Sequence, residues 1–145
     1  MEFNYYKSFV DFKYMSNNKN TGVDQYLHET QTWVRALDFY KQENAFLKTR
    51  LSQVVDNNSN KDFLAQAEHF NNRFLFIDEY IKELRQDTRM QIEMIKQSLS
   101  GNHLQDNVMV GLQKKLRGEM ERFENDVYTL KNVFNKKLVI YFDIS

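Results

Sequence analysis

Mostly apolar residues recur at alternating steps of four and three positions in three successive stretches of the chain. This spacing puts them on one stripe of an α-helix, a seam, which packs against partner helices. The first seam is Tyr26, Thr30, Trp33, Leu37, Tyr40, Asn44, Leu47, Leu51 and Val54. The second seam is Phe63, Ala67, Phe70, Phe74, Ile77, Ile81, Leu84 and Thr88. The third seam is Leu116, Met120, Phe123, Val127, Leu130 and Phe134.

The regular spacing changes between the second and third seams. After Thr88 the apolar residues shift to Ile92, Ile95 and Leu99. The steps from Leu84 to Thr88 and from Thr88 to Ile92 are therefore both four residues long. Such an irregularity, called a stutter, locally unwinds a supercoil. Before the third seam, a less regular apolar face is predicted at Leu104, Val108 and Leu112.

Polar residues and glycine mark the ends of these stretches. Segments 56–60 and 100–102 interrupt the apolar pattern. Capping-box spacing, in which a polar residue precedes an acidic or amide residue by three positions, predicts the helix starts. It occurs at Thr21 with Asp24, at Ser59 with Asp62 and at Asn102 with Gln105. Gly101 fits a left-handed cap at the end of the second helix.

These signals predict an all-α fold, an elongated antiparallel three-helix bundle of coiled-coil type over residues 21–138. The helices are expected near 22–56, 60–100 and 103–138, and the short connections favour antiparallel neighbours. An all-β fold would need many glycine and proline turns, whereas the chain has four glycines and no proline.

Both ends of the chain lie outside this bundle. Residues 1–20 are expected to form an aromatic arm, with a short amphipathic helix over 2–15 and a polar linker. A strand is the rival interpretation, because Val10, Phe12 and Tyr14 alternate with charged residues. Residues 139–145 form an apolar tail, which either continues the third helix or leaves it as a strand.

Composition excludes several classes of function. With 20 basic and 20 acidic side chains the net charge is zero, whereas nucleic-acid binding requires a basic excess. The absence of cysteine excludes disulfides, thiol nucleophiles and thiolate metal sites. No stretch approaches eighteen apolar residues, and the N-terminus lacks the pattern of a secretory signal. The sequence therefore predicts no membrane span and a cytoplasmic location.

Candidate catalytic and metal-binding residues are few. His28, His69 and His103 lie off the seams, and no two of them share a helix turn. No zincin, di-iron, phosphate-loop or nucleophile-elbow motif occurs. Carboxylate pairs such as Glu79 with Glu83 lie beside basic residues and are typical of solvated ion pairs. The sequence thus predicts neither an enzyme nor a metal or cofactor site.

Three kinds of residue within the helices invite two interpretations each. Asn44 either fixes the register of the bundle or bonds at its edge to water or to a neighbouring helix. Trp33 is expected to anchor the core rather than to form a ligand platform. Gly111 and Gly118, seven residues apart, either mark a close helix contact or a flexible stretch, or they simply weaken the first turns of the third helix.

The helices carry more apolar side chains than their seams need. Phe39, Phe46, Leu75, Phe76, Met90 and Met94 lie off the seams, and Met109 is expected to join the methionines across the turn. Wider apolar arcs predict a further packing partner, either the arm with Phe9 and Phe12, a second copy or another protein. The other interpretation is that these residues fill an ordinary four-layer core.

The function predicted from these features is a non-enzymatic scaffold or interaction module that associates with itself or with another protein. The alternative is a sensor that binds a small ligand or cofactor in an aromatic pocket lined by Trp33, Tyr40, Phe70 and Phe74. Three long heptad helices with a tryptophan on the first seam resemble spectrin-type repeats over about residues 22–138. The stutter and the aromatic arm are not part of that pattern, and we assign no family.

Overall fold

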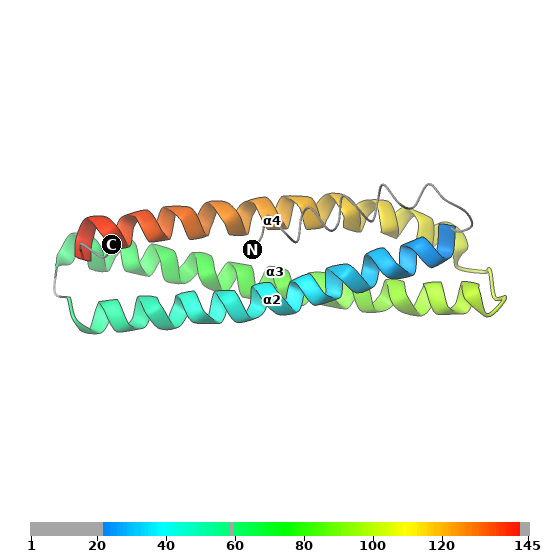
Figure 1. Ribbon diagram of the computed structural model, residues 1–145, viewed down its shortest axis with the longest axis horizontal. Coiled ribbons are helices and arrows are strands. Elements are labelled where there is room, and N and C mark those ends of the chain that lie inside the picture. The colour runs from blue at the N-terminus through cyan, green and yellow to red at the C-terminus, as the bar shows by residue number, and fades with distance from the viewer. Residues whose placement is uncertain (1–21, 59, 143–145) are drawn as a thin grey trace. The chain divides into compact units, whose positions relative to one another are not determined.

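Three long helices make up the described part of the chain, residues 22–58 and 60–142 of a computed structural model. They are α2 (Gly22–Asp56), α3 (Lys61–Leu99) and α4 (Asp106–Phe142), and they pack against one another (Figure 1). No strand occurs among these residues. The all-α three-helix prediction is confirmed, whereas the predicted helix and rival strand within residues 1–20 lie outside the described residues. None of the three helices is long and apolar enough to cross a membrane.

The helices divide between two compact units. The described residues of unit 1 are 22–38 and 83–121, and those of unit 2 are 39–58, 60–82 and 122–142. Each unit therefore contains one segment of every helix, and each has its own interior. A three-helix segment can bury a continuous seam from each helix, which is how the heptad pattern is satisfied in both units.

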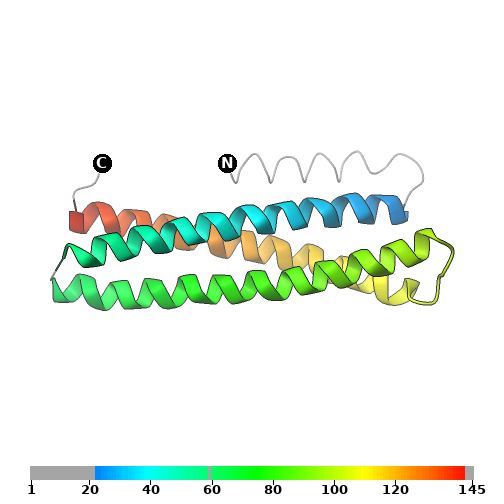
Figure 2. The ribbon, with the colours of Figure 1, turned by 90° about the horizontal axis from the view of Figure 1, so that it is seen from below.

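Contacts within unit 2 define the directions of the helices. Rings pair between α3 and α4 at Phe70 with Phe134 and at Tyr80 with Phe123. The order is reversed along the two helices, so α3 and α4 are antiparallel. Between α2 and α4 the pairs are Tyr40 with Glu124 and Glu43 with Lys131. These keep the same order, so α2 runs parallel to α4 and antiparallel to α3, as predicted and as Figure 2 shows.

The ends of α3 follow from local hydrogen bonds. Asn60 caps its start, because Asn60 Oδ1 accepts a bond from the Phe63 N–H at 3.1 Å. This cap lies one residue after Ser59, and the capping box predicted at Ser59 lies outside the described residues. Gly101 has a φ of +98°, and Asn102 N–H donates to Gln97 O at 2.9 Å. This is the left-handed glycine cap predicted for the end of the second helix.

The start and end of α4 differ from the sequence prediction. The Asn102 side chain accepts a bond from the Leu104 N–H within the turn, so it does not open the helix. The helix begins instead at Asp106, three residues later than expected. At its other end α4 continues to Phe142, so the described part of the apolar tail is helical and not a strand. The predicted box at Thr21 lies outside the described residues.

The predicted stutter in the second seam is wrong. The buried positions of α3 after Thr88 include Gln91, Ile95 and Ser98, which keep the alternating steps of three and four residues, with Met94 buried beside them. The third seam likewise extends back through the buried residues Gln113 and Met109, whereas Leu104 and Val108 are exposed. The apolar pattern predicted the wrong seam positions in these two segments, because polar residues occupy some of the buried positions.

Candidate functional site

Unit 1 contains a layer of polar side chains at its centre. Each helix contributes one buried seam residue to it: Thr30 from α2, Gln91 from α3 and Gln113 from α4. Gln113 Oε1 accepts a bond from Gln91 Nε2 at 2.7 Å and lies 3.2 Å from Thr30 Oγ1. Gln91 Nε2 also donates to Met109 O at 2.8 Å, while Gln91 Oε1 has no hydrogen-bond partner. The layer joins all three helices of the unit but leaves one buried acceptor unsatisfied, which costs stability.

A buried ion pair extends this layer toward the α2–α4 edge of unit 1. Glu29 is 3% exposed and accepts a bond from Gln113 Nε2 at 2.6 Å. Arg117 binds the same carboxylate through two bonds, Nε to Oε2 at 2.8 Å and Nη2 to Oε1 at 2.7 Å. This hydrogen bonding raises the pKa of Arg117 above its already high ordinary value. A cationic group whose pKa is higher in the folded than in the unfolded protein stabilises the fold at every pH below its pKa in the unfolded chain. The stability contributed by Arg117 is therefore lost only in strong alkali.

Unit 2 has an aromatic interior with a single polar member among its described buried residues. Asn44 is 4% exposed, and its Nδ2 donates to Phe74 O at 2.9 Å and to Asp78 Oδ1 at 2.7 Å. Asp78 also pairs with Lys48. Asn44 is thus buried and hydrogen-bonded to α3, while its role in setting the register stays a prediction.

The rings that the sequence suggested as a ligand pocket pack against other side chains. Phe134 lies 5.2 Å from Phe70 and 5.1 Å from Phe74, measured between ring centroids. Tyr40 contacts Phe123 edge-on at 5.5 Å. In unit 1, Trp33 is fully buried, as expected of a core anchor. These rings fill core positions of their units.

The residues predicted to bind a partner lie at several different places. Phe46, Leu75, Phe76 and Met90 are exposed, by 63%, 48%, 55% and 57% respectively. Phe46 lies three residues after Glu43, which pairs with Lys131 of α4, so Phe46 is on the α2–α4 edge. Phe76 lies four residues before Tyr80, which contacts Phe123 of α4, so Phe76 is on the α3–α4 edge. The predicted set is therefore not one continuous patch. Phe9 and Phe12 lie outside the described residues.

Two other members of the predicted set are not free surface residues. Met94 is buried in unit 1 in a cluster with Ile95 and Met109, so its placement on an outer face is wrong. It packs inward because it flanks the seam on the side that meets α4. Met109 joins it across the turn as expected. Phe39 is partly buried and packs edge-on against Tyr40 at 5.3 Å.

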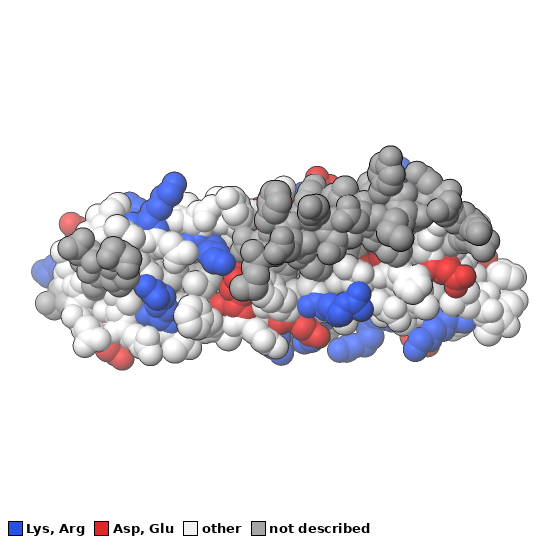
Figure 3. All heavy atoms as spheres, in the orientation of Figure 1, with Lys and Arg blue, Asp and Glu red and all other residues white. Residues whose placement is uncertain are grey.

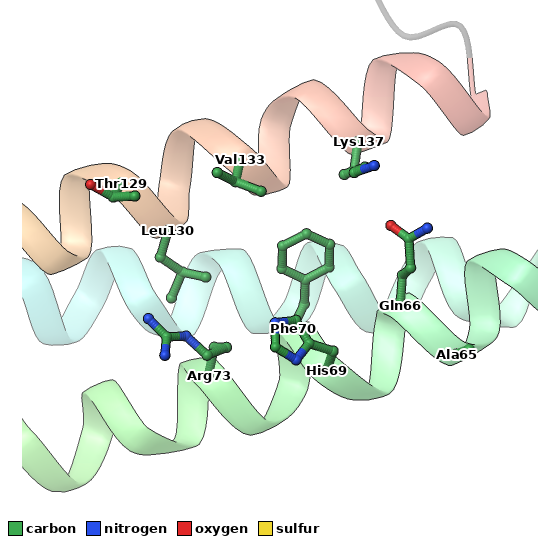
Figure 4. Close-up of a pocket in the computed structure, with 9 residues that line it drawn as sticks. All are labelled: Ala65, Gln66, His69, Phe70, Arg73, Thr129, Leu130, Val133 and Lys137. Atoms are coloured by element: carbon green, nitrogen blue, oxygen red, sulfur yellow. The ribbon is translucent and has the colours of Figure 1, made fainter.

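A groove lies between α3 and α4 of unit 2 (Figure 4). It has a volume of about 410 Å³. Its lining is Ala65, Gln66, His69, Phe70, Arg73, Thr129, Leu130, Val133 and Lys137. Figure 4 shows the side chains of Gln66 and Lys137 at one end and those of Arg73 and Thr129 at the other. The floor is apolar, and both full charges in the lining are positive.

The sequence analysis missed this groove, although a signal for it exists. Arg73 directly precedes the seam residue Phe74, and Val133 directly precedes the seam residue Phe134. Positions just before a seam residue lie on the same flank of each helix. In an antiparallel pair such flanks meet, so residues at these positions line the α3–α4 edge.

A serine, a histidine and an aspartate meet near the α3–α4 turn of unit 1 without forming a catalytic triad. Ser98 Oγ lies 3.3 Å and Asp106 Oδ2 lies 2.9 Å from the same nitrogen, His103 Nδ1. A triad requires the serine and the carboxylate to use opposite ring nitrogens. The cluster instead ties the turn to the start of α4. Among the described residues no group of three His, Asp or Glu side chains is placed to hold a metal.

The outer charges are mixed in sign. On the face drawn in Figure 3, basic and acidic side chains are interspersed and neither forms a continuous field.

Gly111 faces open space, since a Cβ added there would meet nothing within 4 Å. It therefore marks no close helix contact, so for this residue the flexible stretch and the weakened helix remain as predictions. Comparison of the chain with protein-family models, curated proteins and solved structures finds no match.

Proposed function

We propose that this protein is a non-enzymatic interaction module that binds a second copy of itself or another protein through apolar side chains on its outer faces. The observation that carries the proposal is the exposure of Phe46, Leu75 and Phe76 in unit 2, each by about half or more. Burying one such side chain in an interface stabilises it by about 1.5–3 kcal/mol. A partner that covers the neighbouring Leu75 and Phe76 gains both contributions, which offset part of the cost of association.

The use of the charged residues supports the same proposal. Glu29, Glu43 and Asp78 each bind a cation on a neighbouring helix. They therefore hold helices together within their units. A general acid or base needs a cleft where it reaches substrate, and these carboxylates are already committed to structural ion pairs.

Sedimentation velocity of the full chain over a range of concentrations tests the proposal. For self-association, the average mass should rise with concentration in the wild type and much less in a Phe46→Ser/Phe76→Ser variant. Gln42→Ser/Asn72→Ser, at two exposed polar positions on the same helices, is the matched control and should behave as the wild type.

A constant mass would exclude self-association and leave binding to another protein. In that case, cross-linking in the native host should yield a bound protein that the Phe46→Ser/Phe76→Ser variant no longer captures. Equal capture by the wild type and by this variant would contradict the proposal.

A further inference from the structure

The α3–α4 edge of unit 2 differs from the other two edges of that unit in its charges. Glu43 with Lys131 spans the α2–α4 edge, and Lys48 with Asp78 spans the α2–α3 edge. Between the described residues of α3 and α4 in unit 2 there is no ion pair. Arg73 on α3, which is exposed, and Lys137 on α4, which is half-buried, line the groove there without a carboxylate partner among the described residues. This edge therefore offers cations that the bundle itself does not neutralise.

The groove has a buried apolar floor, 4% exposed at Phe70 and 7% at Leu130, and an apolar wall that is exposed to water. Phe70 and Leu130 are seam residues that form its base, and Val133 beside them is 44% exposed. The volume of about 410 Å³ corresponds to roughly ten or more water molecules at about 30 Å³ each. Because water next to apolar side chains is released on docking, an apolar occupant gains free energy here.

The apolar surface continues beyond the groove along both helices. Phe76, 55% exposed, follows Arg73 by three residues on α3. Ile140, 70% exposed, follows Val133 by seven residues on α4. Spacings of three and seven keep residues on one helix face, so the exposed apolar positions follow the direction of the groove. An occupant that matches them is extended along the helices and carries its own apolar stripe, as a helix in a groove does.

We infer that the α3–α4 groove of unit 2 binds an amphipathic helix of a partner protein whose apolar stripe is flanked by aspartate and glutamate. This rests on the proposed function and specifies the chemistry of its partner. The stripe covers Phe70, Leu130 and Val133. The acidic flanks meet Arg73 at one end and Lys137 at the other, and Arg73 can bind a carboxylate through two parallel hydrogen bonds. Charges at such a rim act mainly on specificity and on the rate of association.

The experiment uses fluorescence anisotropy with the full chain and two labelled peptides of about 18 residues, roughly five helical turns. Both peptides carry the same leucine stripe, with glutamate flanks in one and lysine flanks in the other. The acidic peptide should bind at least about tenfold tighter, and its advantage should shrink as salt rises. Charge reversal in Arg73→Glu/Lys137→Glu should remove the preference. The control Lys41→Glu/Lys82→Glu changes the net charge equally at exposed positions outside the groove and should keep it.

Three results would overturn the inference. The first is equal binding of the acidic and the basic peptide, and the second is equal loss of binding in the Arg73/Lys137 variant and in the control. The third is displacement of the acidic peptide by laurate at lower concentration than by unlabelled peptide, which would assign the groove to a small anionic amphiphile. Circular dichroism of each variant checks that it is folded. If any of these three results is found while the Phe46→Ser/Phe76→Ser variant does lose association, the groove is rejected as the binding site. The proposed function then still stands.

Discussion

Unit 1 and unit 2 are built from segments of the same three helices, yet their interiors differ in polarity. Six of the seven buried polar side chains among the described residues belong to unit 1, and only Asn44 belongs to unit 2. The six are Glu29, Thr30, Thr88, Gln91, Ser98 and Gln113. Among the described residues the buried aromatic rings are distributed in the opposite way, with only Trp33 in unit 1. Those of unit 2 are Tyr40, Phe63, Phe70, Phe74, Phe123 and Phe134.

This contrast separates two tasks of a helical core. Apolar packing supplies most of the free energy of folding but tolerates sliding of one helix along another. Buried hydrogen bonds add little net free energy, yet they are satisfied in only one arrangement, because a shifted helix leaves donors and acceptors unpaired. Unit 2 is therefore expected to be the more stable unit, and unit 1 to fix the register of its helix segments.

The largest expected effect comes from the interior of unit 2. Phe74→Ala removes a fully buried ring that packs against Phe70 and Phe134, and should lower the free energy of unfolding by about 3–5 kcal/mol. Phe76→Ala, two residues away and exposed, should change it by less than about 0.5 kcal/mol. Urea unfolding followed by circular dichroism measures both. Similar losses for the two variants would show that this interior is not packed as described.

Next in size is the ion pair of unit 1. Arg117→Met leaves the Glu29 carboxylate buried without its cation and should cost about 2–3 kcal/mol, below the range for fully buried pairs because Arg117 is one-third exposed. Lys131→Met, which frees the less buried Glu43, should cost about 1 kcal/mol or less. In the double variant Glu29→Met/Arg117→Met, the loss should be smaller than in Arg117→Met alone. Urea unfolding of the two single variants and the double variant measures the coupling between Glu29 and Arg117. If the losses of the single variants simply add up to that of the double variant, the coupling is contradicted.

Replacing the polar layer makes unit 1 resemble unit 2. Gln113→Leu alone removes a partner from Gln91 and Glu29 and should cost about 1–3 kcal/mol. The triple variant Thr30→Val/Gln91→Leu/Gln113→Leu removes the layer together with the unsatisfied Gln91 oxygen. The free energy of unfolding of this triple variant should be within about 1 kcal/mol of the wild-type value, or higher than it. A triple variant that loses more than Gln113→Leu would mean that the layer stabilises unit 1 rather than specifying its register.

The smallest effect tests local helix stability. All four glycines of the chain fall within the residue ranges of unit 1, and none within unit 2. Gly111→Ala should stabilise the protein by about 0.5–1 kcal/mol, because the new methyl group meets open space in a helix. Gly101→Ala should instead destabilise it, since φ is +98° there. Slower amide hydrogen exchange at the start of α4 would accompany the first change, and faster exchange there would refute it.

Sequence reasoning succeeded where buried residues are apolar and regularly spaced. Phe63, Phe74 and Phe123 lie in the core because no other arrangement of a heptad helix hides them. The glycine cap at Gly101 was also predictable, since few other residues adopt its backbone conformation. Asn44 was recognised as unusual, but its partners Phe74 O and Asp78 come from another helix.

The same reasoning failed where side chains depend on a partner helix. The polar residues Gln91 and Ser98 do not stand out in an apolar pattern, so the seam was wrongly assigned to Ile92 and Leu99. Met94 looked like a surface methionine but meets Met109 across the turn. The groove was missed because Arg73 and Lys137 are 64 positions apart in the chain. In each case the burial or contact involves residues on two helices.

The amino-acid sequence by itself determined that residues 22–58 and 60–142 form three helices and most of the apolar stripe that each one buries, since helix periodicity and the removal of apolar surface from water act within each segment. Only the tertiary structure decided which polar side chains lie inside and which cations have no carboxylate partner among the described residues. A glutamine amide is costly in the interior unless a second helix supplies its hydrogen bonds, and a lysine or arginine is neutralised only when a carboxylate of another helix reaches it.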